Sequence, residues 1–150
     1  MSLEDLYRDV ILDHYRNPRK RGHLQHPDAQ ASGDNPLCGD EVTVELHLAE
    51  DRVLEVAIWG QGCSISQASA SMMGDAIEGK DRQEIEELIR KFKAMLAIEG
   101  NGEVPVDPGR PGSVLGDLEA LQGVRKFPVR IKCANLPWST LEEALASPQT

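Results

Sequence analysis

Three cysteines and one aspartate are the residues of this chain whose types and spacing fit metal binding. In the string DNPLCGDEVTV, Cys38 and Asp40 flank Gly39 at the start of a predicted strand. Side chains at positions i and i+2 of an extended segment point to the same side, and the glycine lets the backbone bend, so both could reach one ion. Cys63 follows the next predicted strand, where the ends of a hairpin lie close together, whereas Cys133 needs tertiary packing to join them.

Together these side chains form a donor set of mixed hardness. Three thiolates and one carboxylate make a four-coordinate, tetrahedral set that zinc accepts. Thiolates are soft and favour zinc or iron–sulfur centres, whereas the carboxylate of Asp40 is harder and is the ligand most easily displaced. Such a set indicates a site intended to open. The spacing alone leaves open that the cysteines are small buried hydrophobic residues, because it lacks the compact pattern of a zinc finger.

Composition limits the class of protein. The 150 residues fit one domain, residues 1–150, which can bury about two-thirds of its unfolded surface. The net charge of −9 argues against a nucleic-acid partner, because a phosphate backbone would repel it. The N-terminus lacks the apolar core of a signal peptide, and no apolar run approaches membrane-spanning length. We therefore expect a cytoplasmic protein with reduced thiols and no membrane partner.

Periodicity predicts an α+β fold, with a small antiparallel sheet of about three strands covered on one face by helices. Strand-like alternation occurs at residues 41–50 and 52–60, after a loop or irregular edge strand at 24–37. The predicted helices are 2–16, 66–79, one capped by Asp81, a short one at 117–124, and 130–147, broken at Pro137 and resuming near Ser139. Residues 99–116, with five glycines and three prolines, are predicted to be a loop or an insertion.

Longer strings around the cysteines resemble a known family. NPLCGD, GQGCSISQASASMM and KFPVRIKCANLPW closely resemble the U-type iron–sulfur cluster assembly scaffolds, the family of IscU and of the NifU N-terminal domain. Within it, the string LQGVRKFPVRIKC and the insertion before it are most similar to the SufU-type, zinc-binding branch. The resemblance extends from the first predicted helix almost to the C-terminus.

The resemblance implies a SufE/IscU-like fold in which Cys38, Asp40, Cys63 and Cys133 converge on one exposed site. It implies a cysteine desulfurase as sulfur donor, and downstream iron–sulfur assembly or recipient proteins as further partners. Classical members hold a nascent [2Fe–2S] cluster. SufU-type members resemble Zn²⁺ proteins that receive persulfide sulfur and relay it, with a desulfurase histidine replacing one zinc ligand to free the first cysteine. The chain would then act as a sulfurtransferase partner of the desulfurase rather than as a stand-alone enzyme.

Two departures from the classical scaffolds favour the zinc-dependent sulfur acceptor. Lys132 stands where those scaffolds have a histidine, and FPVRIK replaces their double-proline chaperone-binding segment. A scaffold for a transient [2Fe–2S] cluster and a structural zinc-binding module remain the alternatives. A structural zinc is less expected because a domain of this size does not need a metal in order to fold.

Individual residues near the cysteines receive predicted roles. Cys38 is the expected sulfur acceptor because glycine and proline surround it, and Cys133 is the second choice. Lys132 and Arg125 belong to a basic segment before Cys133 and are expected to stabilise an anionic site. Trp138, beside Pro137, is expected to cover the apolar side of the predicted metal site.

Other polar and aromatic residues are expected to have structural roles. His14 and Tyr15 are predicted to be core residues, and His47 is predicted to be exposed. Metal binding by His23 or His26 is not favoured. No histidine stands in a recognisable relation to the serines that follow Cys63, which predicts close helix packing rather than hydrolase chemistry. These serines are Ser64, Ser66, Ser69 and Ser71.

Overall fold

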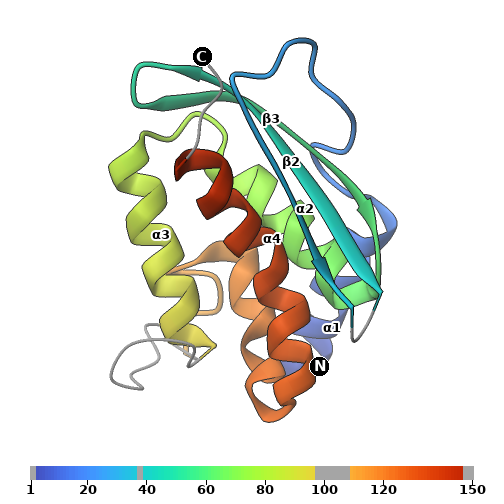
Figure 1. Ribbon diagram of the computed structural model, residues 1–150. Helices are drawn as coiled ribbons and strands as arrows, with labels where there is room; N and C mark the ends of the chain where they lie inside the picture. Colours follow the sequence, from blue (N-terminus) through green and yellow to red (C-terminus); the bar gives the residue numbers. More distant parts are fainter. Residues whose placement is uncertain (1–2, 37–38, 97–108, 147–150) are drawn as a thin grey trace.

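The computed structural model describes residues 3–36, 39–96 and 109–146. Figure 1 shows one antiparallel sheet with helices gathered against one of its faces. The elements, in chain order, are α1 (Leu3–Arg16), β1 (Ala29–Asn35), β2 (Asp40–Ala49), β3 (Arg52–Gln61), α2 (Ser64–Ile77), α3 (Arg82–Met95), the 3₁₀ helix η1 (Gly116–Lys126) and α4 (Pro128–Ala146). This arrangement confirms the α+β prediction.

The sheet has the order β1-β2-β3, with both neighbouring pairs antiparallel. Its register pairs Asn35 with Asp40 at one end of β1–β2, and Glu41 with Gln61 at the same end of β2–β3. The end of β1, the start of β2 and the end of β3 therefore lie together at one end of the sheet. The segment predicted as a loop or edge strand contains β1, which is one of the two edge strands of this sheet.

The helical layer buries the apolar face of the sheet. Alternation along β2 places Val44 and Leu46 fully inside, where they join a continuous hydrophobic core with Met73 of α2 and Leu141 of α4. Helices α2 and α4 pack directly on the strands, and α1 packs on α2 and η1. A core of this extent stabilises the fold without requiring a metal ion.

Local signals explain several boundaries. Asp81 is the N-cap of α3, as the sequence predicts, and it also forms a capping box with Glu84. The prediction for the last helix was wrong, because α4 continues through Pro137 instead of breaking there. Burial holds α4 together: the neighbouring Trp138 is fully buried and stacks on Phe92 of α3, with ring centroids 4.5 Å apart.

Three further details differ from the expectations. The short helix near residue 117 is a 3₁₀ helix that extends to Lys126. Tyr15 is 45% exposed, whereas the preceding His14 is buried as expected. His47 is only partly exposed, because its Nε2 bonds the carbonyl of Gln25 at 2.8 Å.

Most of the predicted loop at 99–116 lies outside the described residues. Within the described ranges, no helix is both long and apolar enough to cross a membrane.

Candidate metal centre

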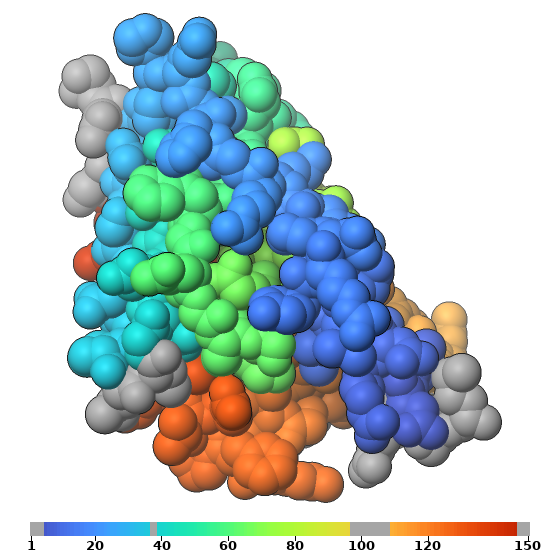
Figure 2. All heavy atoms as spheres, turned by 90° about the vertical axis from the view of Figure 1, so that its right-hand side faces the viewer, coloured from blue at the N-terminus to red at the C-terminus, as the bar shows by residue number. Residues whose placement is uncertain are grey.

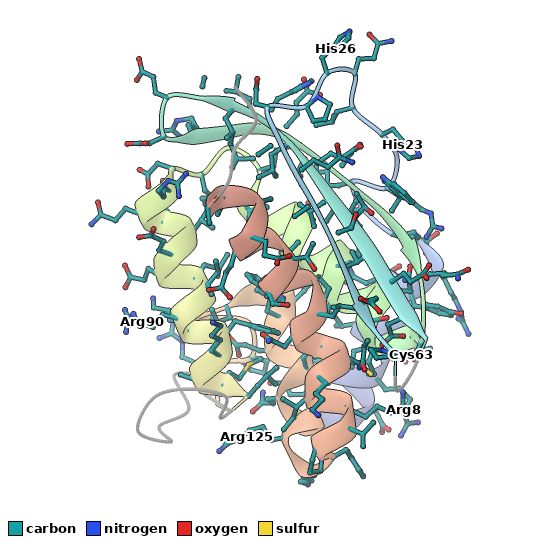
Figure 3. All side chains as sticks on the ribbon, viewed as in Figure 1. Arg8, His23, His26, Cys63, Arg90 and Arg125 are labelled. Atoms are coloured by element: carbon teal, nitrogen blue, oxygen red, sulfur yellow. The ribbon has the colours of Figure 1, made fainter. Side chains whose placement is uncertain are left out.

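Three elements bring together three of the four predicted ligands at one end of the sheet. Asp40 is the first residue of β2, Cys63 is the N-cap of α2, and Cys133 lies in the second turn of α4. One ligand atom from each lies within 4.8 Å of the other two. Figure 3 shows Cys63 at the end of the sheet where the β strands approach the lower helices. The convergence expected of these residues is therefore present for three of them.

Asp40 is held as an oriented carboxylate. The residue is fully buried, and its Oδ1 accepts a 2.8 Å hydrogen bond from the backbone N–H of Cys63. Its Oδ2 lies 3.9 Å from Sγ of the same cysteine. Burial of a carboxylate is costly unless hydrogen bonds or a cation compensate for the lost water. One oxygen is thus fixed by the backbone, and the other faces the thiol.

Cys63 occupies the N-terminal end of α2, where the backbone N–H groups favour negative charge. The residue is partly exposed, so a partner molecule can reach it. Ser66 Oγ lies 3.9 Å from its Sγ and donates a 3.1 Å hydrogen bond to its carbonyl oxygen. Gly62 precedes it, and a Cβ at that position would collide with Oδ1 of Asp40. The close approach of this loop to the carboxylate therefore requires glycine.

Cys133 closes the cluster from the helical side. The residue is fully buried, and its Sγ lies 3.6 Å from the carbonyl oxygen of Val129, one turn earlier in α4. The neighbouring Lys132 is exposed. Of the two thiols that the structure describes, the one of Cys63 is therefore the more accessible.

The donor set fits zinc. Zinc binds thiolate sulfur at about 2.3 Å and carboxylate oxygen at about 2.1 Å, which puts such ligands about 3.6 Å apart in a tetrahedron. The separation of 3.9 Å between Sγ of Cys63 and Oδ2 of Asp40 is close to that value. Two thiols and one carboxylate leave room for one more ligand in a tetrahedral set. The same soft donors also suit iron.

Cys38, the fourth predicted ligand and the predicted sulfur acceptor, lies outside the described residues. The residues around it are placed: Asn35 pairs with Asp40, and the N–H of Gly39 donates to the carbonyl of Asn35 at 2.9 Å. The ligand role of Cys38 stays a prediction.

The other residues singled out in the sequence occupy different places. Arg125, in the last turn of η1, lies on the far side of the lower helices from Cys63 (Figure 3). His23 and His26 lie in the loop before β1, well away from Cys63. The ring of His23 instead contacts Trp59, with centroids 4.9 Å apart. The roles of Arg125 and of Lys132 therefore stay predictions.

The serines that follow Cys63 show a relation that the sequence analysis missed. No sequence pattern relates a histidine to them, yet Nδ1 of His14 lies 2.8 Å from Oγ of Ser71, 57 positions away. Ser69 donates to the carbonyl of Ala134 at 2.6 Å and accepts from the indole N–H of Trp138 at 3.1 Å. Trp138 thus packs in the core, and its expected role beside the metal centre stays a prediction. Close packing is confirmed for Ser66, Ser69 and Ser71, which are buried, whereas Ser64 is half-buried.

A comparison with protein families decides the classification. Residues 6–134 match the model of the NifU-like N-terminal domain. The chain belongs to the NifU-like N-terminal domain family. This membership confirms the resemblance stated from the cysteine strings, and the fold agrees with it.

Individual members of the NifU-like N-terminal domain family are similar over almost the whole chain. The zinc-dependent sulfurtransferase SufU of Bacillus subtilis (strain 168) is 44% identical over 145 residues, which are 97% of this chain and 92% of that protein. The scaffold protein IscU of Streptococcus pyogenes serotype M1 is 39% identical, over 96% of this chain and 85% of that protein. A crystal structure from Fervidobacterium islandicum AW-1, described as a scaffold protein for the SUF system, superimposes with a TM-score of 0.80. It is 33% identical and covers 96% of this chain and 99% of its own.

Proposed function

We propose that this protein is a zinc-dependent sulfur acceptor in iron–sulfur cluster assembly, which takes persulfide sulfur from a cysteine desulfurase and relays it. The observation that carries the proposal is the buried carboxylate of Asp40, hydrogen-bonded to the backbone of Cys63 and grouped with Cys63 and Cys133. A hard, displaceable ligand among thiols favours a site that opens over a closed structural one. Similarity to the sulfurtransferase of B. subtilis supports the same choice.

The residues of the chain have distinct roles in this proposal. When bound, zinc keeps coordinated thiols deprotonated at neutral pH. The thiolate of Cys38 attacks the outer sulfur of the donor persulfide, forming a new S–S bond while the donor S–S bond breaks. The donor leaves as a thiolate and takes up a proton, so no external oxidant is needed. Asp40 holds its place through the Cys63 backbone, and the buried Cys133 anchors the site from α4.

The acceptor role of Cys38 is favoured over that of Cys133, the second choice, because Cys133 is buried. Cys133 belongs to α4 and is fully buried, so a large donor protein cannot reach its sulfur. Lys132 is exposed beside it, and there a lysine ammonium favours negative charge on nearby thiolates. We place this chemistry in the cytoplasm, where thiols stay reduced and a desulfurase and recipient proteins would be available.

A cluster scaffold is the second candidate. The thiol-rich donor set suits iron as well as zinc, and the IscU relative of S. pyogenes is named as a scaffold. Lys132 stands where classical scaffolds have a histidine, and this difference weighs against the scaffold function. A structural zinc module is weaker, because the continuous core does not depend on the metal centre.

The decisive experiment measures zinc, iron and acid-labile sulfide per chain after strictly anaerobic purification. About one zinc with no iron or sulfide is the result expected for a tetrahedral zinc site. Mass spectrometry after incubation with a cysteine desulfurase and cysteine should then find the added sulfur on Cys38, and not in Cys38→Ser. Iron with matching sulfide would make the protein a cluster scaffold and overturn the proposal.

Asp40→Ala tests the ligand assignment. We expect weaker zinc retention against a chelator, because the carboxylate ligand is removed. Asp34→Ala is the matched control, since Asp34 lies exposed on β1 close to the same end of the sheet. Equal zinc retention in the two variants would show that Asp40 is not a ligand.

A further inference from the structure

An open groove runs beside the metal centre. Its volume is about 780 Å³, and its walls come from α1, the start of α2, η1 and the start of α4. Figure 2 shows α1 in blue, the start of α2 in green and the η1–α4 segment in orange meeting on one face of the molecule. Ser64 and Ile65, directly after the ligand Cys63, form part of the wall. Whatever fills the groove therefore lies next to the candidate metal centre.

The charge of the groove is opposite to that of the chain. Its lining includes Arg8, Lys126 and Arg130 but no aspartate or glutamate, although the chain has a net charge of −9. Among the described residues, neither Lys126 nor Arg130 forms an ion pair, and Arg8 has only an exposed contact of 3.7 Å with Asp5. These cations are available to carboxylates from outside.

The remaining lining is apolar. Ile11, Leu12, Ile65 and Val124 contribute to the floor and walls, and Phe127 stands at the rim with 60% of its surface exposed. An exposed phenylalanine beside a groove is typical of an anchor for a binding partner rather than of a core residue.

Tyr7 adds a neutral polar group to the same wall. Its hydroxyl accepts a 2.9 Å hydrogen bond from the side chain of Gln122. Burial and the nearby Glu119 carboxylate raise the pKa of the Tyr7 phenol above its usual value, although the Gln122 bond opposes this. The phenol therefore stays protonated at neutral pH and does not offset the positive charge of the groove.

We propose that this groove is the docking site for an acidic, amphipathic segment of a protein partner. Apolar side chains of that segment would lie against Phe127 and Ile65, and its carboxylates would face Arg8, Lys126 and Arg130. The inference deepens the proposed function and rests on it, because sulfur exchange at the adjacent thiols is what would bring a partner to this groove. Charge complementarity then supplies fast association and orientation.

Two labelled peptides test the proposal directly. Both have leucines on one helical face over roughly 18 residues, and the polar positions are glutamate in one and lysine in the other. Fluorescence anisotropy with the full chain should show saturable binding of the glutamate peptide only, weakening as salt is added. Amide shifts in NMR spectra should change around Ile65 and Val124.

Variants locate the binding. Arg130→Glu and Phe127→Asp should each weaken it about tenfold or more, because like charges or a buried carboxylate now face the peptide. Arg90→Glu and Leu54→Asp are the matched controls, because Arg90 lies exposed on α3 far from the groove and Leu54 is an exposed apolar residue of β3 (Figure 3). Both controls should bind like the unaltered chain.

Every other outcome overturns the proposal. These outcomes are equal binding of the lysine peptide, no saturable binding, equal losses in the controls, or amide shifts elsewhere. Two more are a Phe127-dependent dimer in sedimentation experiments, and binding of anionic phospholipid vesicles instead of the peptide. The same titration with Cys63→Ser separates the two proposals: it should bind the glutamate peptide normally even if persulfide transfer is lost or never existed.

Discussion

His14 of α1 and Ser71 of α2 share a buried hydrogen bond of 2.8 Å between Nδ1 and Oγ, although 57 positions separate them. The backbone N–H of Arg19 also donates to this Oγ at 2.8 Å. The Asp117 carboxylate of η1 only accepts, so Nε2–H of His14 donates to it at 2.8 Å, and a neutral ring then accepts the Ser71 hydroxyl hydrogen at Nδ1. One imidazole thus links three helices and uses all of its hydrogen-bonding capacity.

Replacement of His14 by phenylalanine should destabilise the fold. The variant loses two hydrogen bonds and leaves the Ser71 hydroxyl without its acceptor, for which we expect a loss of about 2 kcal/mol in the free energy of unfolding. Urea unfolding followed by circular dichroism measures it. Tyr15→Phe is the control, because Tyr15 is 45% exposed and should change stability by less than about 0.5 kcal/mol. Equal stability of the two variants would contradict the structural role of His14.

Glu119→Gln should loosen the segment that leads into η1. The Glu119 carboxylate is fully buried and accepts backbone hydrogen bonds from Gly112, Val114 and Leu115 at 2.8–3.0 Å. A glutamine turns an N–H₂ group toward some of these N–H donors, which should cost about 2 kcal/mol.

Hydrogen exchange distinguishes this effect from general unfolding. The amides of Val114 and Leu115 should exchange faster in Glu119→Gln, while those of β2 stay protected. Glu87→Gln is the control, because Glu87 makes only exposed ion pairs on α3. Unchanged protection at Val114 and Leu115 would show that the carboxylate does not hold this segment.

Much of the fold was predictable because its signals are local. The alternation of residues 41–50 and 52–60 predicted β2 and β3, and Asp81 marked the start of α3 as its cap. Pro137 was misread because a proline locally favours a break, whereas burial of Trp138 against Phe92 depends on residues far away in the sequence. The exposure of Tyr15 likewise depends on which helices flank α1.

The candidate site was predictable to the extent that long sequence strings surround its cysteines. Those strings identified Asp40, Cys63 and Cys133, which the fold brings together. Neither the Ser66 contact with Cys63 nor the His14–Ser71–Asp117 network was found. A serine three residues after a helix N-cap was a usable signal for the first. The second joins positions up to 103 residues apart, which no local pattern reveals.

His47 should make stability depend on pH. Its bond to the Gln25 carbonyl, and then the carboxylates of Glu55 and Asp28, raise the pKa of His47 above its usual value, against a smaller opposing effect of burial. Because the pKa of His47 is raised in the folded state, protonated His47 stabilises the fold. This contribution is fully present below the unfolded-state pKa of about 6.5 and is lost as pH rises through the folded-state pKa.

The measurement compares urea unfolding at about pH 5.5 and about pH 8.5, on either side of the histidine range. The stability advantage over His47→Gln should be larger at the lower pH. His26→Asn should follow the pH dependence of the unaltered chain, since asparagine accepts the positive φ of 53° found at this exposed position. An advantage that grows with pH would reverse the assigned direction.

Gly62→Ala should disturb the candidate metal centre without replacing any of its predicted ligands. An added Cβ would collide with Oδ1 of Asp40 and approach Oγ of Ser66 at 2.7 Å, in a loop held by the Asp40–Cys63 hydrogen bond. The loop must shift, which should cost about 1–3 kcal/mol of unfolding free energy in chelator-treated protein. The shift also moves the carboxylate away from Cys63, so zinc should be lost to a competing chelator more readily. Gly123→Ala is the matched control, because a Cβ at Gly123 meets nothing within 4 Å. If both variants unfold alike and retain zinc alike, the close approach of the Gly62 loop does not position Asp40.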